Sequence, residues 1–239
     1  AAYYLALMGH HAAIYEKRQK LGGMMRYGIP SYRFPRELLD AEIESILSLG
    51  IEVHTGMKVG NEISFDELKA NYDCLYISIG AHTDKKLGIP GEDAKGVVSA
   101  VKMLRDIEGE DSIGVLSAVQ MLGQIGDDIM PDFTDQNVVV VGGGNVAMDA
   151  ARCAKRLGAE NVYIVYRRSM NELPARKEEV EHAVEEGIIF NLLTNPVEIL
   201  TDDNGWVKGM VVRKMELGEP DASGRRRPVE IPGSDYTID

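Results

Sequence analysis

Residues 137–168, NVVVVGGGNVAMDAARCAKRLGAENVYIVYRR, decide the fold of this chain. Four consecutive valines predict a buried strand, and a glycine turn leads from it into a helical pattern that stops at Gly158. A second apolar strand runs from Val162 to Tyr166. Strand, turn, helix and strand in this order predict one complete βαβ unit with parallel strands.

The turn in this unit has the spacing Gly142, Gly144, Ala147, which matches G-x-G-x-x-A between a strand and a helix. Gly142 allows a tight turn, Gly144 lets the backbone approach a pyrophosphate, and Ala147 permits close packing of the helix against the strand. The N–H groups at the start of a helix favour an anion. We therefore predict a dinucleotide-binding site, with a purely structural tight turn as the alternative.

The end of the next strand indicates which dinucleotide is bound. An NAD-specific domain usually has an acid there, on the ribose 2′-hydroxyl, whereas this chain has Arg167 and Arg168. Guanidinium groups bind a 2′-phosphate through charge-assisted hydrogen bonds, so we expect NADPH rather than NADH, with Arg176 as a further contact. Two solvated surface arginines are the alternative.

The residues before this unit also alternate between helical and strand patterns, as an α/β fold requires. The opening residues predict a helix up to Gly9 and a strand from Ala12 to Tyr15. Glu16 then stands where an acid commonly binds a ribose hydroxyl. Three further elements are a helix, an alternating strand and a continuous buried strand: Pro35–Gly50, Ile51–Thr55 and Cys74–Ile79.

Two elements are expected after the βαβ unit. A helix around Ala175 to Glu186 stops at Gly187, and a turn from Thr201 to Gly205 joins two strand-like runs as a hairpin. The region between residues 101 and 135 reads as mostly helical, interrupted by several glycines.

Composition narrows the class of protein. A formal net charge of -12 over 239 residues repels phosphodiester backbones and anionic lipid, so we expect neither a nucleic-acid nor a membrane partner. Cys74 and Cys153 lie far apart, which gives no disulfide framework and no zinc motif and fits a cytoplasmic protein. Because the chain opens at Ala1 directly in a helical pattern, we expect a fragment of a longer protein.

Five motifs in order carry a resemblance to a known family. They are LGGMMRYGIPSYRFPRELLDAEI, IPGED, GGGNVAMDAAR, YRRSMNELPARKEEVEHAVEEGI and MELGEPDASGRRRPVEI, at residues 21–43, 89–93, 142–152, 166–188 and 215–231. Together they resemble the small (beta) subunit of glutamate synthase and its relatives, over nearly the whole chain. These relatives include the flavoprotein subunits of ferredoxin:NADP-type transhydrogenases and the flavin half of dihydropyrimidine dehydrogenase.

The resemblance implies two Rossmann-like domains, a truncated FAD-type domain and an inserted NAD(P)-binding domain. We expect a partial FAD-binding domain at 1–110, a connecting segment at 111–135 and an NADPH-binding domain at 136–239. By resemblance, Glu16, Lys17, Gly23 and Gly80 lie near FAD. The residues implied near NADPH are Gly142, Gly144, Asn145, Val146, Arg167 and Arg168. The family's N-terminal G-x-G-P-A-G loop, its returning C-terminal segment and its cysteine-rich cluster domain are absent from the sequence.

The activity implied by the resemblance is hydride transfer from NADPH to FAD and onward to iron–sulfur centres of a partner domain or subunit. Hydride transfer needs positioning rather than a protein nucleophile, so we nominate no catalytic residue. We also find no converging metal ligands in the sequence. Two alternatives remain: a non-catalytic NAD(P)-binding module, and an NADH-specific relative.

Overall fold

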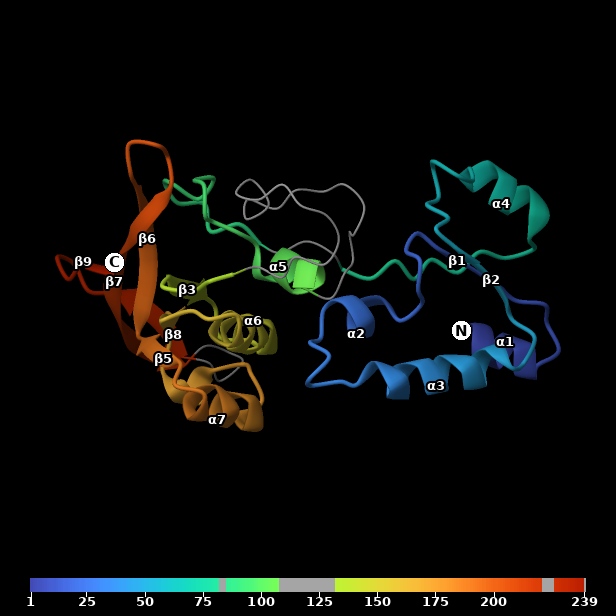
Figure 1. Cartoon of the computed structure of the whole chain (residues 1–239), viewed down its shortest axis with the longest axis horizontal. Coiled ribbons are helices and arrows are strands. Elements are labelled where there is room, and N and C mark those ends of the chain that lie inside the picture. The colour runs from blue at the N-terminus through green and yellow to red at the C-terminus, as the bar shows by residue number, and fades with distance from the viewer. Residues whose placement is uncertain (82–84, 108–131, 221–225, 239) are drawn as a thin grey trace. The chain divides into compact units, whose positions relative to one another are not determined.

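The computed structural model describes residues 1–81, 85–107, 132–220 and 226–238 (Figure 1). The chain divides into two compact units, Ala1–His82 and Thr83–Asp239. Both units contain helices and parallel strand pairs, so the expected α/β class is confirmed. None of the described helices is both long enough and apolar enough to cross a membrane.

The first unit is built around a short parallel strand pair. Its helices are α1 (Ala2–Leu7), α2 (Gly23–Tyr27), α3 (Arg36–Leu47) and α4 (Phe65–Asn71), and its strands are β1 (Ala13–Glu16) and β2 (Glu52–Thr55). The predicted helix and both flanking strands are therefore present. α3 begins directly after Pro35, whose fixed φ suits a helix start, and is followed by Gly50 at φ +81.

The sequence prediction of a buried strand at Cys74–Ile79 is wrong. Residues 74–81 lie outside both strands of this unit's sheet, and Tyr76, Ile77 and Ile79 are exposed by 74%, 67% and 76%. An apolar run shows that side chains favour burial, but a strand also needs a neighbouring strand to complete its backbone hydrogen bonds. In the described residues β1 and β2 pair only with each other.

The second unit combines a parallel and an antiparallel sheet. Its helices are α5 (Ala100–Ile107), α6 (Asn145–Arg156), the 3₁₀ turn η2 (Met170–Glu172) and α7 (Lys177–Glu185). Strands β3 (Asn137–Val141), β4 (Asn161–Tyr166) and β5 (Ile189–Leu192) pair in parallel in that order. The antiparallel strands are β6 (Thr194–Thr201), β7 (Val207–Pro220), β8 (Arg226–Glu230) and β9 (Tyr236–Ile238).

Alternation along the valine-rich strands explains how the parallel sheet is covered on both faces. Val140, Val162 and Ile164 belong to the core cluster shared with α5, α6 and α7. Val139, Val141 and Val165 point to the opposite face, into a second cluster with the antiparallel strands. The parallel sheet is therefore the middle layer of this unit, which accounts for the continuous apolar runs in its strands.

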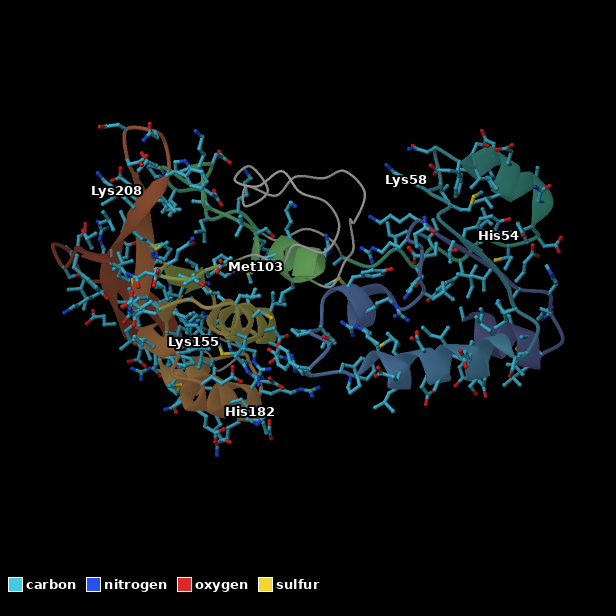
Figure 2. All side chains as sticks on the ribbon, viewed as in Figure 1. His54, Lys58, Met103, Lys155, His182 and Lys208 are labelled. Carbon is cyan, nitrogen blue, oxygen red and sulfur yellow. The ribbon has the colours of Figure 1, made fainter. Side chains whose placement is uncertain are left out.

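α6 is buried over most of its surface because its side chains are small. Ala147, Ala150, Ala151 and Ala154 all lie in the core, next to α5, α7 and the sheet. Met103 on α5 belongs to the same cluster and is labelled in Figure 2. Alanines let neighbouring backbones approach closely at little cost in side-chain entropy.

The position of α5 affects the expected domain boundaries. α5 packs on α6 within the second compact unit, whereas the sequence placed residues 100–107 in an FAD-binding domain ending at residue 110. Most of the expected connecting segment, 111–135, lies outside the described residues. The division by cofactor therefore stays a prediction.

The hairpin between β6 and β7 has the expected polar turn. The Asp202 carboxylate accepts the N–H groups of Trp206 and Asn204 at 2.8 and 2.9 Å. The Trp206 N–H is the main reason why the pKa of Asp202 lies below its ordinary value. Gly205, at φ +78, supplies the left-handed position that closes the turn.

Candidate functional site

The glycine turn between β3 and α6 has the geometry that its spacing predicted. Gly142 has φ +145, where a side chain would be strained, and its N–H donates to the Val165 carbonyl at 3.0 Å. A Cβ added at Gly142 would lie 3.4 Å from the Cβ of Ala147, which is itself buried. A tight turn and close helix packing are therefore both present at these positions.

The start of α6 is open toward an anion. Gly144 is the N-cap residue and provides no side-chain cap, and the first turn of α6 contains no acid. A Cβ added at Gly144 would meet no described atom within 4 Å, so the backbone is open on that side. Asn145 and Val146 are the first two residues of α6, where backbone N–H groups lack the carbonyl of a preceding turn. These features suit a phosphate group.

Gly143, which the sequence reasoning missed, joins the turn to the rest of the unit. A Cβ at this position would come within 2.8 Å of both the Tyr166 ring and Leu173 Cδ2. The Gly143 carbonyl also accepts the Ala175 N–H at 3.1 Å. The sequence did contain an indication of this role, because Gly143 is a third consecutive glycine and G-x-G-x-x-A requires only two.

The connection from β4 to α7 carries the three arginines predicted near the nucleotide. Arg167 and Arg176 are exposed, and Arg168 is half-buried. Arg168 Nε donates to the carbonyl of Arg226 in β8 at 2.9 Å, a contact that the sequence did not indicate. The Tyr166 hydroxyl donates to the Glu172 carbonyl at 2.9 Å and so fixes the bend of this connection.

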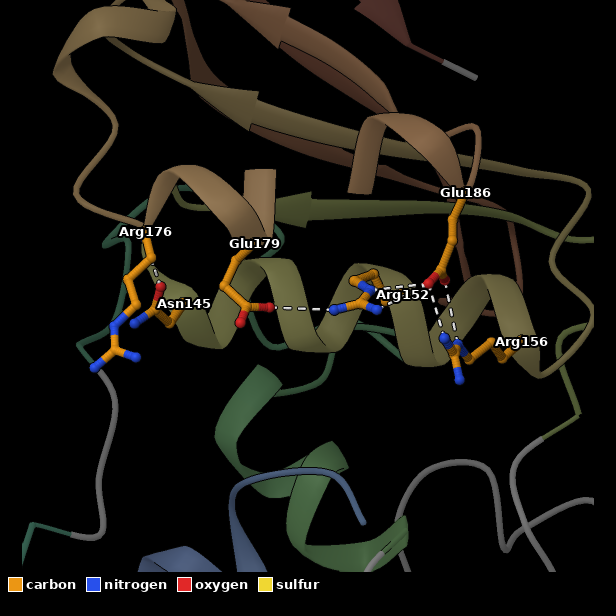
Figure 3. A network of polar contacts seen from close by, with 6 residues as sticks. All are labelled: Asn145, Arg152, Arg156, Arg176, Glu179 and Glu186. Carbon is orange, nitrogen blue, oxygen red and sulfur yellow. Dashed lines mark hydrogen bonds and ion pairs between the residues drawn. The ribbon is translucent and has the colours of Figure 1, made fainter. Parts of the chain in front are cut away.

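One hydrogen bond ties this connection directly to the start of α6. The Arg176 N–H donates to Asn145 Oδ1 at 2.9 Å (Figure 3). Asn145 is the first residue of α6, and Arg176 is the N-cap residue of α7. The bond therefore joins the beginnings of two helices, and the Arg176 guanidinium points away from both (Figure 3).

Ion pairs join the same two helices farther along α6 (Figure 3). Arg152, whose side chain is 8% exposed, donates to Glu179 at 3.1 Å and to Glu186 at 2.9 and 3.0 Å. Arg156 donates to Glu186 at 2.8 and 3.2 Å. The hydrogen bond from Arg156 is the largest cause that lowers the pKa of Glu186, and burial opposes it. The network holds α7 against α6.

The four residues that the resemblance implied near FAD lie in the first unit. Glu16 is the last residue of β1, as expected, and its carboxylate accepts the Arg18 N–H at 3.0 Å. Lys17 and Gly80 are exposed, and Gly80 has φ +69. Gly23 begins α2 at φ +52. Their contact with a flavin stays a prediction.

Three rings pack together beside this strand pair. Tyr15 stacks on His54 with 4.5 Å between ring centroids, and its hydroxyl is 3.0 Å from that of Tyr72 (Figure 2 labels His54). The hydrogen bond with Tyr15 is the main cause that raises the pKa of Tyr72 to about 12. The Tyr72 hydroxyl therefore stays protonated at physiological pH, and the three rings contribute packing.

The cysteines show no redox pair. Cys153 is 6% exposed in the core of α6, as expected of a small hydrophobic residue, while Cys74 is exposed. In the described ranges, no group of three or more His, Cys, Asp or Glu side chains could hold a metal ion.

Comparison with known proteins places the chain in a family. The model of the family described as pyridine nucleotide-disulphide oxidoreductase matches residues 1–222. The chain is 42% identical over its full length to the NADP(+)-dependent formate dehydrogenase subunit beta of Moorella thermoacetica, and covers 31% of it. It is 32% identical over 96% of its length to the glutamate synthase [NADPH] small chain of Escherichia coli, and covers 47% of it. The chain thus spans less than half of either relative.

Solved structures show the same fold. The FprA protein of Mycobacterium tuberculosis in complex with NADPH superimposes with a TM-score of 0.81 at 19% identity, over 99% of this chain and 65% of FprA. The resemblance to the glutamate synthase small-subunit group is confirmed by the relatives, and the α/β fold by FprA. Because the family model covers nearly the whole sequence, the chain belongs to the pyridine nucleotide-disulphide oxidoreductase family.

Proposed function

We propose that the protein is an NADPH-dependent flavoprotein oxidoreductase, which passes electrons from NADPH through FAD to a partner centre. The observation that carries the proposal is the uncapped start of α6 behind an open glycine turn, with arginines on the neighbouring connection. When bound, NADPH supplies a hydride and FAD accepts it. The contribution of this chain is to bind and orient the nucleotides.

The pyrophosphate of NADPH is assigned to the glycine turn. The N–H groups of Asn145 and Val146 bind it, and the missing side chain of Gly144 leaves room for it. Ala147 keeps α6 close to β3, so that the helix start faces the phosphates. Together these residues form the phosphate site of the proposed NADPH-binding domain, residues 136–239.

Selection of NADPH over NADH is assigned to the connection after β4. Arg167 and Arg168 follow the strand at whose end an acid would bind the ribose 2′-hydroxyl of NADH. Arg168 Nε donates to the Arg226 carbonyl, which restrains the side chain, and we assign its two terminal NH₂ groups to the phosphate. Arg176 adds a third guanidinium.

FAD is assigned to the first unit, with Glu16, Lys17, Gly23 and Gly80 near it. Support comes from Glu16, whose half-buried carboxylate ends β1 where a ribose hydroxyl is expected. Several relatives are named as subunits, so we also propose a partner subunit with iron–sulfur centres. A cytoplasmic location is part of the proposal, because Cys74 and Cys153 form no disulfide.

Substitution of the arginines tests the nucleotide assignment. We expect Arg167→Ala in the intact protein to weaken NADPH binding by about 1.5–3 kcal/mol, because a charged hydrogen bond to the 2′-phosphate is lost. NADH binding should change little. Lys208→Ala, on β7 (Figure 2), removes a cation from the same unit outside the proposed site and serves as the control.

The same titrations discriminate between the proposals. Tighter binding of NADH than of NADPH in the unsubstituted protein, together with affinities that Arg167→Ala and Arg168→Ala leave unchanged, would favour the NADH-specific alternative. Selective NADPH binding without any hydride transfer to flavin would favour a non-catalytic NADP-binding module.

A further inference from the structure

We propose that Asn145 is a positioning residue for nucleotide selectivity: its side chain holds Arg176 in place, and Arg176 binds the 2′-phosphate. The inference rests on the proposed NADPH site and goes beyond it by coupling a turn residue to a specificity residue. It assigns Asn145 an indirect action, through its acceptor oxygen, on a guanidinium that lies 31 positions later in the sequence.

The bond between Asn145 and Arg176 is well defined. Asn145 Oδ1 accepts the Arg176 N–H at 2.9 Å, between the first residue of α6 and the N-cap residue of α7. Ala175, one residue earlier, donates its N–H to the Gly143 carbonyl at 3.1 Å. Two successive backbone N–H groups are therefore held by two residues of the glycine turn and helix start.

This double attachment fixes the backbone of Arg176 but leaves its side chain available. The residue is exposed, and Figure 3 shows the guanidinium beyond the start of α6, pointing away from both helices. The ion pairs of Arg152 with Glu179 and Glu186 hold the remainder of α7. The Arg176 side chain is thus anchored at its base on a rigid pair of helices, which lowers the entropy lost when it binds a phosphate.

The location favours the 2′-phosphate over the pyrophosphate as the target. Arg176 lies on the connection after β4, as do Arg167 and Arg168, and the ribose 2′ position is expected at the end of that strand. The pyrophosphate is expected at the backbone N–H groups of the α6 start. Asn145 contributes to both parts, since its N–H belongs to the helix start and its Oδ1 accepts the backbone N–H of Arg176.

Two small nucleotides distinguish recognition of the 2′-phosphate from recognition of the 5′-phosphate. Adenosine 2′,5′-bisphosphate carries the 2′-phosphate, and AMP lacks it, so the ratio of their dissociation constants isolates 2′-phosphate recognition. Calorimetric titration of the intact protein would compare the wild type, Asn145→Ala, Arg176→Ala and the double variant. Glu186→Gln, which loosens α7 at its other end, is the matched control.

We expect the wild type to prefer the bisphosphate and each single variant to reduce this preference about tenfold, as loss of one charged hydrogen bond predicts. The double variant should reduce it no further, because both changes remove the same interaction. Glu186→Gln should lower the melting temperature but keep the preference.

Other results overturn the inference in distinguishable ways. An unchanged preference in Arg176→Ala would remove Arg176 from 2′-phosphate recognition, whatever the Asn145 variants do. Equal weakening of both nucleotides by Asn145→Ala would assign Asn145 to the shared 5′-phosphate. If the reductions in preference of the two single variants multiply in the double variant, Asn145 does not act through Arg176. A loss of preference in Glu186→Gln would likewise exclude a specific coupling between Asn145 and Arg176. A wild type without any preference would instead refute the proposed NADPH selectivity.

Discussion

The three glycines of the turn occupy different environments, although the sequence repeats one residue. Gly142 has a positive φ, and a Cβ at Gly143 would meet the Tyr166 ring and Leu173. A Cβ at Gly144 would enter open space, where we propose that the pyrophosphate binds. Alanine at each position therefore tests a different requirement.

Gly143→Ala should destabilise the protein by about 1–3 kcal/mol. Its Cβ would lie 2.8 Å from side-chain atoms of Tyr166 and Leu173, so those residues must shift in a packed region. Thermal or denaturant unfolding measures the loss. Unfolding parameters equal to those of the wild type would show that the β4–α7 connection does not pack on the turn.

Gly144→Ala should have the opposite pattern. Its Cβ enters open space and its φ of -89° suits any residue, so the melting temperature should stay unchanged. Nucleotide affinity should fall, because the methyl group occupies the approach of the pyrophosphate. Unchanged affinity for NADPH would show that the pyrophosphate does not bind at this turn. The pair of variants separates packing from binding within two adjacent residues.

At the residue scale, the spacing G-x-G-x-x-A was enough to predict the turn and the small residue at Ala147. The spacing could not reveal the role of Gly143, since that depends on Tyr166 and Leu173 reaching back from the next strand and loop. Nor could it show that Arg168 donates to the carbonyl of Arg226, which lies 58 residues later in the sequence. Such contacts follow from tertiary packing.

At the scale of elements, the packing of α7 on α6 is stabilised by ion pairs in a largely apolar environment. Glu186→Gln should lower the free energy of unfolding by about 1.5–3 kcal/mol, because Arg152 and Arg156 both donate to this carboxylate. Glu181→Gln on the same helix is the control, since its partner Lys177 is 87% exposed and the pair contributes little. Equal effects of the two variants would show that the α6–α7 ion pairs do not stabilise the fold.

The same network predicts a pH dependence. The pKa of Glu186 is lowered in the folded protein, so its stabilising contribution is present above the pKa of the unfolded chain, about 4.3. That contribution is lost as the pH falls through the lower, folded-state pKa. Below about pH 4.3, the unfolding free energy of the wild type should therefore decrease more steeply with falling pH than that of Glu186→Gln. Parallel curves would contradict the lowered pKa.

The extent to which elements could be predicted follows from the range of their interactions. α3, α6 and the β6–β7 hairpin were predictable, because periodicity, Pro35 and the polar turn at Asp202 act locally. The strand predicted at Cys74–Ile79 is absent because the pairing of a strand depends on a neighbour distant in the sequence, which local patterns do not reveal. The middle-layer role of the parallel sheet also became visible only when the antiparallel strands covered its second face.

At the scale of the whole molecule, the two units correspond to two proposed tasks. The second unit has the open turn, the arginines and the paired helices to which we assign NADPH. The first unit has a carboxylate at the end of its first strand, where FAD is assigned. Hydride transfer requires both nucleotides, so the proposed activity needs both units.

The visible absorption spectrum of the intact protein, recorded anaerobically before and after NADPH or NADH in separate cuvettes, tests this proposal most directly. We predict flavin absorption bands that NADPH bleaches rapidly and NADH only slowly, because the arginines favour the 2′-phosphate. A spectrum without flavin bands, or bands that NADPH leaves unchanged, would contradict the proposed function.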